Sequence, residues 1–279
     1  MEREWSGNPR RLSRADLAEI ERRILAGETF ATAAAAVGCS TRSIQRFLAS
    51  TGGLKRRLKE RSALRLSLAE REDISRVERS TPWALAWRAG APDTEVIRAE
   101  AIASISPDQV RSIQQRLHGA MAGGDYAFCY STYPLVQALL ERWAPGGPHE
   151  ELLAELNQPA MLDLIRAVTA IPDLVKADGQ ATLYRPGHFL ARHDDSEPAR
   201  GRRVAYVLNL CGDPDGAPWR PEWGGMLQFL TDAGAPDETL LPRFNALNLF
   251  RVPQPHHVTS VASFAPLTRF AVTGWFRDR

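Results

Sequence analysis

The segment "FLARHDD" at residues 189–195 places a histidine and an aspartate two positions apart, at His193 and Asp195. Side chains at positions i and i+2 of a strand project to the same face, so these two can converge on one point while Asp194 points away. Imidazole and carboxylate are suitable ligands for Fe(II), and no thiolate is needed. The pair is therefore a candidate for the first two ligands of a metal site.

A third ligand must come from another segment. The other histidines late in the chain are His188, His256 and His257, and the last two stand about sixty residues downstream in "PQPHHV". Two histidines and one carboxylate form the facial triad of non-haem iron sites, which leaves three octahedral positions open for reactants. A His-x-Asp pair alone is more often a polar surface loop, so the surrounding sequence must decide between the two interpretations.

The elements that would position these residues are short strands. From residue 174 onward the hydrophobic period approaches two, in runs that Gly, Pro or Asp separate. A series of such strands late in a chain predicts a sandwich or barrel of the jelly-roll kind. The runs are 174–185, 188–195, 203–210, 224–230, 245–252, 256–264 and 269–276. Residues 92–170, by contrast, have a mostly helical pattern.

In their order, these runs resemble the Fe(II)/2-oxoglutarate-dependent dioxygenases of the prolyl 4-hydroxylase type, over roughly residues 90–279. The shared series is "ATLYRPGHF", the His-x-Asp of "ARHDD", "RVAYVLNL", the Gly-Gly strand "EWGGMLQFL", the His-x-Val of "PHHV" and the arginine strand "TRFAVTGWF". The combination is far more specific than any single motif. It implies an α+β fold, in which a double-stranded β-helix (jelly roll) is flanked by helices.

The resemblance implies a metal centre and its reactants. His193, Asp195 and His256 would bind Fe(II). His256 is preferred to His257 because it fills the first position of the His-x-Val motif, and strand alternation would turn His257 to the other face. The co-substrates would be 2-oxoglutarate and O₂, with ascorbate as a candidate reductant.

The resemblance also implies contacts to 2-oxoglutarate. Arg269 would hold the distal carboxylate, because a guanidinium pairs with a carboxylate through two hydrogen bonds. Tyr184 and Thr273 are expected to add further contacts. Tyr206 is a weaker match, since the relatives place this tyrosine one position later, where the chain has Val207.

The front of the chain is helical and basic. Apolar spacing predicts a helix over 13–26, an Ala-rich helix ending at Gly38 and a third helix over 40–50, which is the layout of a helix-turn-helix. Residues 1–79 hold 17 Lys and Arg against 11 Asp and Glu, whereas the remaining 200 residues hold 18 against 22. A basic front segment indicates an anionic partner such as nucleic acid.

Residues 12–76 resemble the N-terminal part of transposases of the IS30 type. This resemblance implies DNA binding, in which Arg42, Gln45 and Arg46 on the third helix would contact phosphates or base edges. The alternative is that the segment is a remnant of an insertion event with little function of its own.

Composition narrows the setting of the protein. Its three cysteines, Cys39, Cys129 and Cys211, are far apart and odd in number, which argues against a disulfide framework and suits a reducing compartment. No apolar run approaches the ~20 residues that cross a bilayer. The first residues lack the apolar stretch of a secretory signal. We therefore expect a cytoplasmic protein without a membrane partner.

These observations predict two domains, a helix-turn-helix domain over 1–79 and a dioxygenase domain over 80–279. The dioxygenase would hydroxylate a protein side chain, with proline as one candidate, or a small molecule, and would release succinate and CO₂. Two other hypotheses stay open. The chain would be a transposase-derived DNA-binding protein whose β-domain is not catalytic, or the β-domain would be a cupin-like binding module for another metal.

Overall fold

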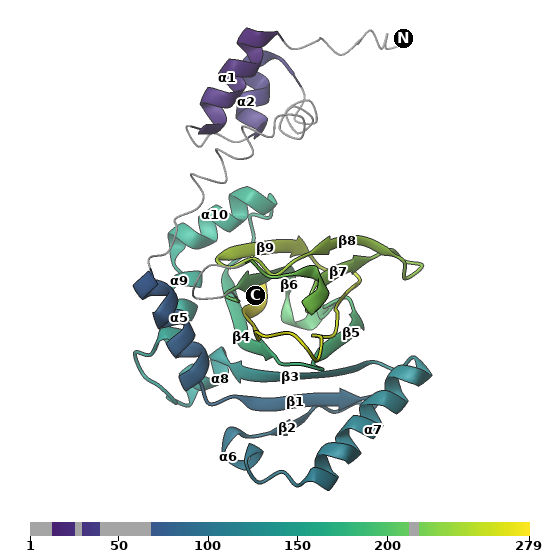
Figure 1. Cartoon of the computed structure of the whole chain (residues 1–279). Helices are drawn as coiled ribbons and strands as arrows, with labels where there is room; N and C mark the ends of the chain where they lie inside the picture. The colour runs from purple at the N-terminus through teal and green to yellow at the C-terminus, as the bar shows by residue number, and fades with distance from the viewer. Residues whose placement is uncertain (1–12, 26–29, 40–67, 212–217) are drawn as a thin grey trace. The chain divides into compact units, whose positions relative to one another are not determined.

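The structure, a computed structural model, describes residues 13–25, 30–39, 68–211 and 218–279 (Figure 1). The chain divides into two compact units, residues 1–67 and 68–279. The division falls before helix α5 (Leu68–Ser80), so this helix belongs to the second unit, whereas the sequence analysis placed it in the first. Within the described part of the chain, no helix combines the length and the apolar character needed to cross a membrane.

Two described helices form part of the first unit, α1 (Arg14–Leu25) and α2 (Phe30–Val37). Ser13 and Asp16 cap the start of α1: the Asp16 backbone N–H donates to Ser13 Oγ at 3.1 Å, and the Ser13 N–H donates to Asp16 Oδ2 at 2.9 Å. The two helices pack on each other with Ile20 and Ala33 fully buried. The third predicted helix, with Arg42, Gln45 and Arg46, lies outside the described residues, so the helix-turn-helix stays a prediction.

The second unit is a curled antiparallel sheet with helices on its outer side (Figure 1). Besides α5, its helices are α6 (Ala99–Ile102), α7 (Pro107–Gly123), α8 (Leu135–Leu140), α9 (Pro148–Leu156) and α10 (Pro159–Thr169). Its strands are β1 (Ala84–Ala89), β2 (Glu95–Ile97), β3 (Ala127–Pro134), β4 (Lys176–Tyr184), β5 (Phe189–His193), β6 (Arg202–Asn209), β7 (Leu227–Leu230), β8 (Pro236–Leu240), β9 (Ala246–Arg251), β10 (His256–Val258) and β11 (Arg269–Arg277).

The sheet order is β8-β7-β10-β5-β3-β4-β11-β6-β9, and β1 joins β3 to β2. The seven strands predicted from residue 174 onward are confirmed as β4, β5, β6, β7, β9, β10 and β11. Strands β1, β2, β3 and β8 were not predicted. β3 interrupts the mostly helical segment and is buried on both faces along most of its length, so it lacks the polar–apolar alternation that marks a half-exposed strand. A curled antiparallel sheet of this kind is consistent with the predicted jelly roll.

Successive side chains of β4 and β11 point alternately to the outer and the inner face of the sheet. The outer side chains Leu183, Phe270 and Val272 join a core cluster with residues of α8, α9 and α10. Helix α7 covers the outer face of β1 and β3 through a second cluster that includes Leu117 and Trp87. The helices therefore leave the inner face of the curled sheet open for a site.

Two glycines let a tyrosine cross the outer face. Tyr206 on β6 stands opposite Gly274 on β11, which stands opposite Gly179 on β4. The Tyr206 hydroxyl passes over both and donates to the Asp178 carbonyl at 3.1 Å. A Cβ atom at Gly179 would collide with that hydroxyl, and one at Gly274 would collide with the Asp178 carbonyl. This close approach fixes the spacing of the strands that carry the inner-face residues.

Candidate metal centre and co-substrate pocket

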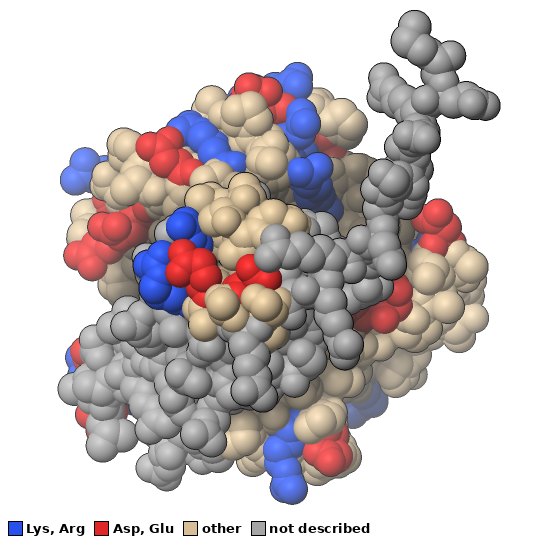
Figure 2. All heavy atoms as spheres, turned by 90° about the horizontal axis from the view of Figure 1, so that it is seen from above, with Lys and Arg blue, Asp and Glu red and all other residues tan. Residues whose placement is uncertain are grey.

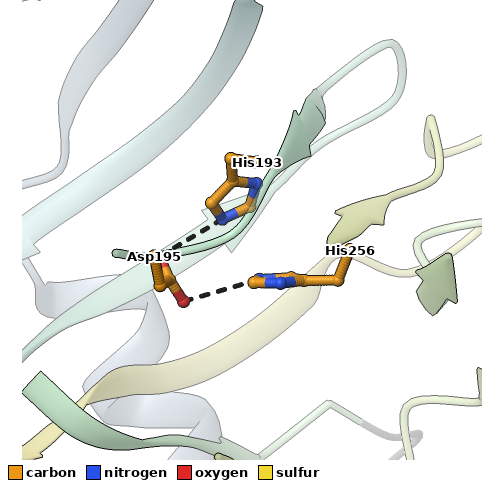
Figure 3. A group of neighbouring side chains, drawn as sticks. All are labelled: His193, Asp195 and His256. Atoms are coloured by element: carbon orange, nitrogen blue, oxygen red, sulfur yellow. Dashed lines mark ion pairs between the residues drawn. The ribbon is translucent and has the colours of Figure 1, made fainter. Parts of the chain in front are cut away.

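His193, Asp195 and His256 meet on the inner side of the sheet (Figure 3). His193 ends β5 and His256 begins β10, and the antiparallel pairing of these strands places the two residues directly opposite each other. Their ring centroids are 4.1 Å apart. The Asp195 carboxylate completes the group, with Oδ1 3.4 Å from His193 Nε2 and Oδ2 3.5 Å from His256 Nε2. One ligand atom from each residue lies within 4.8 Å of the others.

The route by which Asp195 reaches the centre differs from the prediction. Strand alternation was expected to direct His193 and Asp195 to one face, but β5 ends at His193 and Asp195 follows in the left-handed region, with φ of 60°. Aspartate adopts this region more readily than most residues with a Cβ. The turn of the backbone, rather than the pleat of a strand, therefore directs this carboxylate towards the imidazoles.

Backbone carbonyls orient both imidazoles. His193 Nδ1 lies 3.0 Å from the Ala191 carbonyl, and His256 Nδ1 lies 2.7 Å from the Gln254 carbonyl. Because a carbonyl oxygen can only accept, each Nδ1 carries the proton and each Nε2 presents its lone pair to the centre. This is the tautomer that coordinates a metal through Nε2.

The electrostatics of the group suit metal binding. Burial, with His193 nearby, lowers the pKa of His256 to about 4, so its ring is neutral near pH 7. Burial alone would raise the pKa of Asp195, but the neighbouring His193 and His256 side chains hold that pKa below its ordinary value. A neutral imidazole and an ionised carboxylate are the forms that bind metal. Two imidazole nitrogens and one carboxylate, without a thiolate, fit Fe(II).

The neighbouring polar residues are directed elsewhere. His257 Nε2 lies 2.8 Å from Gln228 Oε1, its partner across the β10–β7 pairing. Asp194 accepts hydrogen bonds from the backbone and the hydroxyl of Ser196. His188 lies near the Leu183 carbonyl and shapes the turn between β4 and β5. Of the two adjacent histidines, His256 is therefore the one that joins the group.

Arg269 begins β11 as a buried cation. It is 1% exposed, and its Nε and Nη1 atoms have no hydrogen-bond partner in the described part of the chain. Its guanidinium carbon lies 5.0 Å from the ring centroid of Tyr184, which is its partner on β4. Thr273 lies four residues along β11 on the same face and lines the same cavity. A buried, unpaired guanidinium needs an anion, and a carboxylate can accept two of its hydrogen bonds.

Tyr206 is also among the residues that line this cavity, but most of its side chain is directed away from it. Its ring belongs to the outer core cluster, and its hydroxyl is used by the Asp178 carbonyl. Val207, one position along β6, is the residue opposite Thr273 and packs on the inner side with Ala271. The expected contact of Tyr206 with 2-oxoglutarate is thus not supported by the direction of its side chain.

A cavity of about 200 Å³ joins the metal group to Arg269. Its lining includes residues that the sequence analysis did not single out: Tyr126, Tyr130, Gln180, Arg202 and Trp275. Arg202 stacks on Trp275, with its guanidinium carbon 3.5 Å from the ring centroid. The alternation of β4 and β11 would have indicated Gln180 and Trp275. Tyr126 and Tyr130 depend on β3, which was not predicted.

An anionic partner such as DNA would be expected to bind where Lys and Arg side chains gather on the surface. Figure 2 shows one face of the molecule, on which Lys and Arg side chains lie interspersed with Asp and Glu side chains. Among the residues described on that face, positive charge is therefore not gathered into a single area. The predicted DNA contacts at Arg42, Gln45 and Arg46 lie outside the described residues.

Comparison with known proteins finds a family model that matches the C-terminal part of the chain. Residues 179–277 match the 2OG-Fe(II) oxygenase superfamily. A prolyl-4-hydroxylase from Pseudomonas putida is 20% identical, covering 76% of this chain and 100% of its own, with a TM-score of 0.40. A 2OG-Fe(II) oxygenase family oxidoreductase from Burkholderia pseudomallei is 14% identical, covering 49% and 61%, with a TM-score of 0.38. A prolyl 4-hydroxylase from Phytophthora capsici is 22% identical, covering 53% and 47%, with a TM-score of 0.37. No curated protein matches the sequence.

The chain thus contains a 2OG-Fe(II) oxygenase domain. Its activity is that of a 2-oxoglutarate-dependent dioxygenase, which uses Fe(II), 2-oxoglutarate and O₂.

Proposed function

We propose that this protein hydroxylates a protein side chain or a small molecule at a centre in which His193, Asp195 and His256 hold Fe(II). The observation that carries the proposal is the placement of this ligand group and the unpaired, buried Arg269 on one cavity. In the overall reaction, one oxygen atom of O₂ enters a substrate C–H bond and the other enters succinate, while 2-oxoglutarate loses CO₂. Bound Fe(II) supplies the redox chemistry that activates O₂.

The chain's own residues bind and orient the reactants. Arg269 pairs with the distal carboxylate of 2-oxoglutarate, and the fork of its guanidinium sets the orientation of that group. Thr273 adds a hydroxyl donor from the same strand face, and Tyr184 forms one wall. Tyr206, whose ring packs in the outer core cluster, is not required for 2-oxoglutarate binding in this proposal. An unpaired guanidinium in the cavity also favours a dicarboxylate co-substrate over the cupin-like alternative, which requires no such group.

Exclusion of water is the second task of the pocket. His256, Tyr184 and Arg269 are each less than 5% exposed. In such an environment the charge–charge interaction between Arg269 and a carboxylate is stronger than in water, since solvent screening is reduced. Burial also limits side reactions at the metal in the absence of substrate.

Succinate release from 2-oxoglutarate tests this proposal. The purified protein, loaded with Fe(II) under nitrogen and then exposed to O₂, is expected to convert 2-oxoglutarate slowly even without substrate. Asp195→Ala should abolish this turnover, whereas Asp194→Ala, one residue away with its carboxylate bonded to Ser196, should retain it. Equal turnover in the two variants, or turnover that does not depend on Fe(II), would refute the assignment of the centre.

A further inference from the structure

Asp195 is the member of the metal group that no strand carries, since β5 ends at His193 (Figure 3). On its N-terminal side, the Asp194 carbonyl accepts a hydrogen bond from the Gln254 backbone N–H at 3.2 Å. On its C-terminal side, the chain passes through the short helix η1 (Pro198–Arg200) before it enters β6. Strand pairing does not fix the backbone of this connection, so side-chain contacts must do so. Those contacts determine where the Asp195 carboxylate lies.

Glu197, two residues after Asp195, attaches the connection to two arginines. Its Oε1 lies 2.8 Å from Arg200 Nε, and its Oε2 lies 2.9 Å from Arg202 Nη2. The Arg200 side chain is 61% exposed, whereas that of Arg202 is 14% exposed. An exposed ion pair contributes little to stability, but solvent and salt screen a largely buried guanidinium less. The pair with Arg202 is therefore the stronger attachment, and it joins the connection to β6.

Arg202 is supported in turn by β11. Its guanidinium carbon lies 3.5 Å from the ring centroid of Trp275, and both residues line the cavity of the metal group. Tryptophan is the aromatic side chain that attracts a cation most strongly. The stacking restricts the guanidinium to one position on the inner side of the sheet. The contacts thus run from the strand of Arg269, through Trp275 and Arg202, to the connection that carries Asp195.

The charge of Arg202 acts on the metal group in two ways. Burial lowers the pKa of Arg202, and the carboxylates of Glu197, Asp195 and Asp178 oppose that lowering. The attraction is mutual, so the guanidinium favours the ionised form of Asp195, which is the form that binds metal. A guanidinium would also repel a metal cation in the same cavity, although its pair with Glu197 offsets much of that charge. The two effects have opposite signs, which makes the role of Arg202 testable.

We propose that Arg202 is a positioning residue for the metal centre. Through its pair with Glu197 it fixes the connection after Asp195, and it thereby holds that carboxylate at the point where His193 and His256 converge. This inference rests on the proposed function, which assigns Fe(II) to those three residues. The ion-pair partner of Arg202 is Glu197 and not one of the three ligands, so Arg202 acts through the chain between them.

Iron affinity, measured without turnover on the full-length protein, tests this role. Equilibrium dialysis under nitrogen, in the absence of 2-oxoglutarate, gives Kd for Fe(II). Arg202→Gln should raise this Kd about ten-fold or more, which is the usual effect of removing a residue that orients a metal ligand. Glu197→Gln should raise it by a similar factor. The double variant should show no further rise beyond the larger single effect, because both substitutions remove the same ion pair.

Neighbouring arginines provide the controls. Arg203→Gln is the matched control, since Arg203 is adjacent on β6 but donates to Asp278 Oδ2 at 2.9 Å. Arg200→Gln removes the exposed contact of Glu197 and should leave Kd for Fe(II) close to that of the wild type. Arg202→Lys keeps the charge but lacks the fork of the guanidinium, so it should restore part of the affinity lost in Arg202→Gln. Equal melting temperatures of the metal-free variants would separate a local change at the centre from a general loss of structure.

Each result supports or overturns the inference. An unchanged or lower Kd for Fe(II) in Arg202→Gln would overturn it, and impaired turnover in that variant would then assign Arg202 to the substrate. An equal rise in Arg203→Gln would overturn it as well, because any loss of positive charge would have the same effect. If Arg202→Gln does not fold, Glu197→Gln, at a half-exposed position, decides the question. Iron binding that survives in Asp195→Ala would reject the proposed function itself.

Discussion

Arg269 and Tyr184 face each other across the β11–β4 pairing, with the guanidinium carbon 5.0 Å from the ring centroid. The ring supports the cation from one side but cannot neutralise it, because a cation–π contact is weaker than an ion pair. The buried guanidinium therefore retains its capacity for an anion. Its unpaired Nε and Nη1 atoms are the donors that such an anion would engage.

This relationship predicts the effect of removing the charge alone. Arg269→Met keeps most of the buried volume but loses the charge-assisted hydrogen bonds. We expect Kd for 2-oxoglutarate to rise roughly 30- to 150-fold, equivalent to about 2–3 kcal/mol. Isothermal titration of the Fe(II)-loaded protein would measure it. Arg203→Met, at a half-exposed residue whose partner is Asp278, is the control and should bind 2-oxoglutarate normally. Equal affinity in both variants would exclude the role given to Arg269.

The adjacent residues His256 and His257 allow a test of the metal ligand and a matched control. His256→Ala removes an Nε2 lone pair from the centre, so we expect iron affinity to fall by at least about 100-fold. His257→Ala removes a side chain that contacts Gln228 on the other side of the strand and should retain iron. The measurement is the iron content after equilibrium dialysis under nitrogen. A greater loss in the His257 variant would reverse the assignment within this pair.

A histidine remote from the metal predicts how stability depends on pH. His149 stacks on Tyr133 at 4.7 Å and contacts Thr81, and burial lowers its pKa to about 4. Between the ordinary pKa near 6.5 and the folded value, the unfolded chain binds a proton that the folded chain does not. The free energy of unfolding should therefore decrease as pH falls through this range, by about 1–2 kcal/mol from this residue.

Urea denaturation at pH 7 and pH 5 would separate the contribution of His149 to the free energy of unfolding from that of other groups. His149→Phe keeps an aromatic ring against Tyr133 but cannot take up a proton, so its difference in unfolding free energy between the two pH values should be smaller than in the wild type. His118→Ala, at an exposed position on α7, should leave the wild-type difference unchanged. A pH difference in His149→Phe as large as that of the wild type would assign the effect to other groups.

The glycine row beneath Tyr206 predicts a steric effect. Gly274→Ala would place a Cβ atom against the Asp178 carbonyl, so we expect a loss of about 3 kcal/mol or more in the free energy of unfolding. Gly119 lies in α7 with open space around the position of a Cβ atom. Gly119→Ala should instead stabilise the protein by about 0.5–1 kcal/mol, because alanine favours the helix. Urea denaturation of both variants tests the contrast, and similar effects would contradict it.

Residue types and their order sufficed to predict seven strands, because short strands with a period near two and clear breakers are readable from one sequence. The group of His193, Asp195 and His256 was predicted from the resemblance of that order of motifs to the dioxygenases. The direction of Asp195 was not readable. Its position depends on one left-handed residue after β5, and aspartate is compatible with both conformations. The sequence therefore predicted the carboxylate correctly but for a geometric reason that the structure does not bear out.

The face occupied by Tyr206 shows a second limit. Side chains of a strand alternate, so an uncertainty of one position in the alignment with relatives moves a residue from the inner face to the outer face. Strands β1 and β3 were beyond prediction for another reason. No residue of β1 is exposed, and β3 is buried on both faces along most of its length, so neither strand shows the alternation that would have identified it.

The pairing of β5 with β10 also determines when the protein can acquire its metal. His193 and His256 are about sixty residues apart in the chain, and they become neighbours only through that pairing. A nascent chain that has not yet emerged as far as His256 offers at most two of the three ligands. Metallation must then follow synthesis past His256 and closure of the sheet. The delay keeps redox-active iron away from immature chains, in which oxygen would reach it without a substrate to consume the oxidising equivalents.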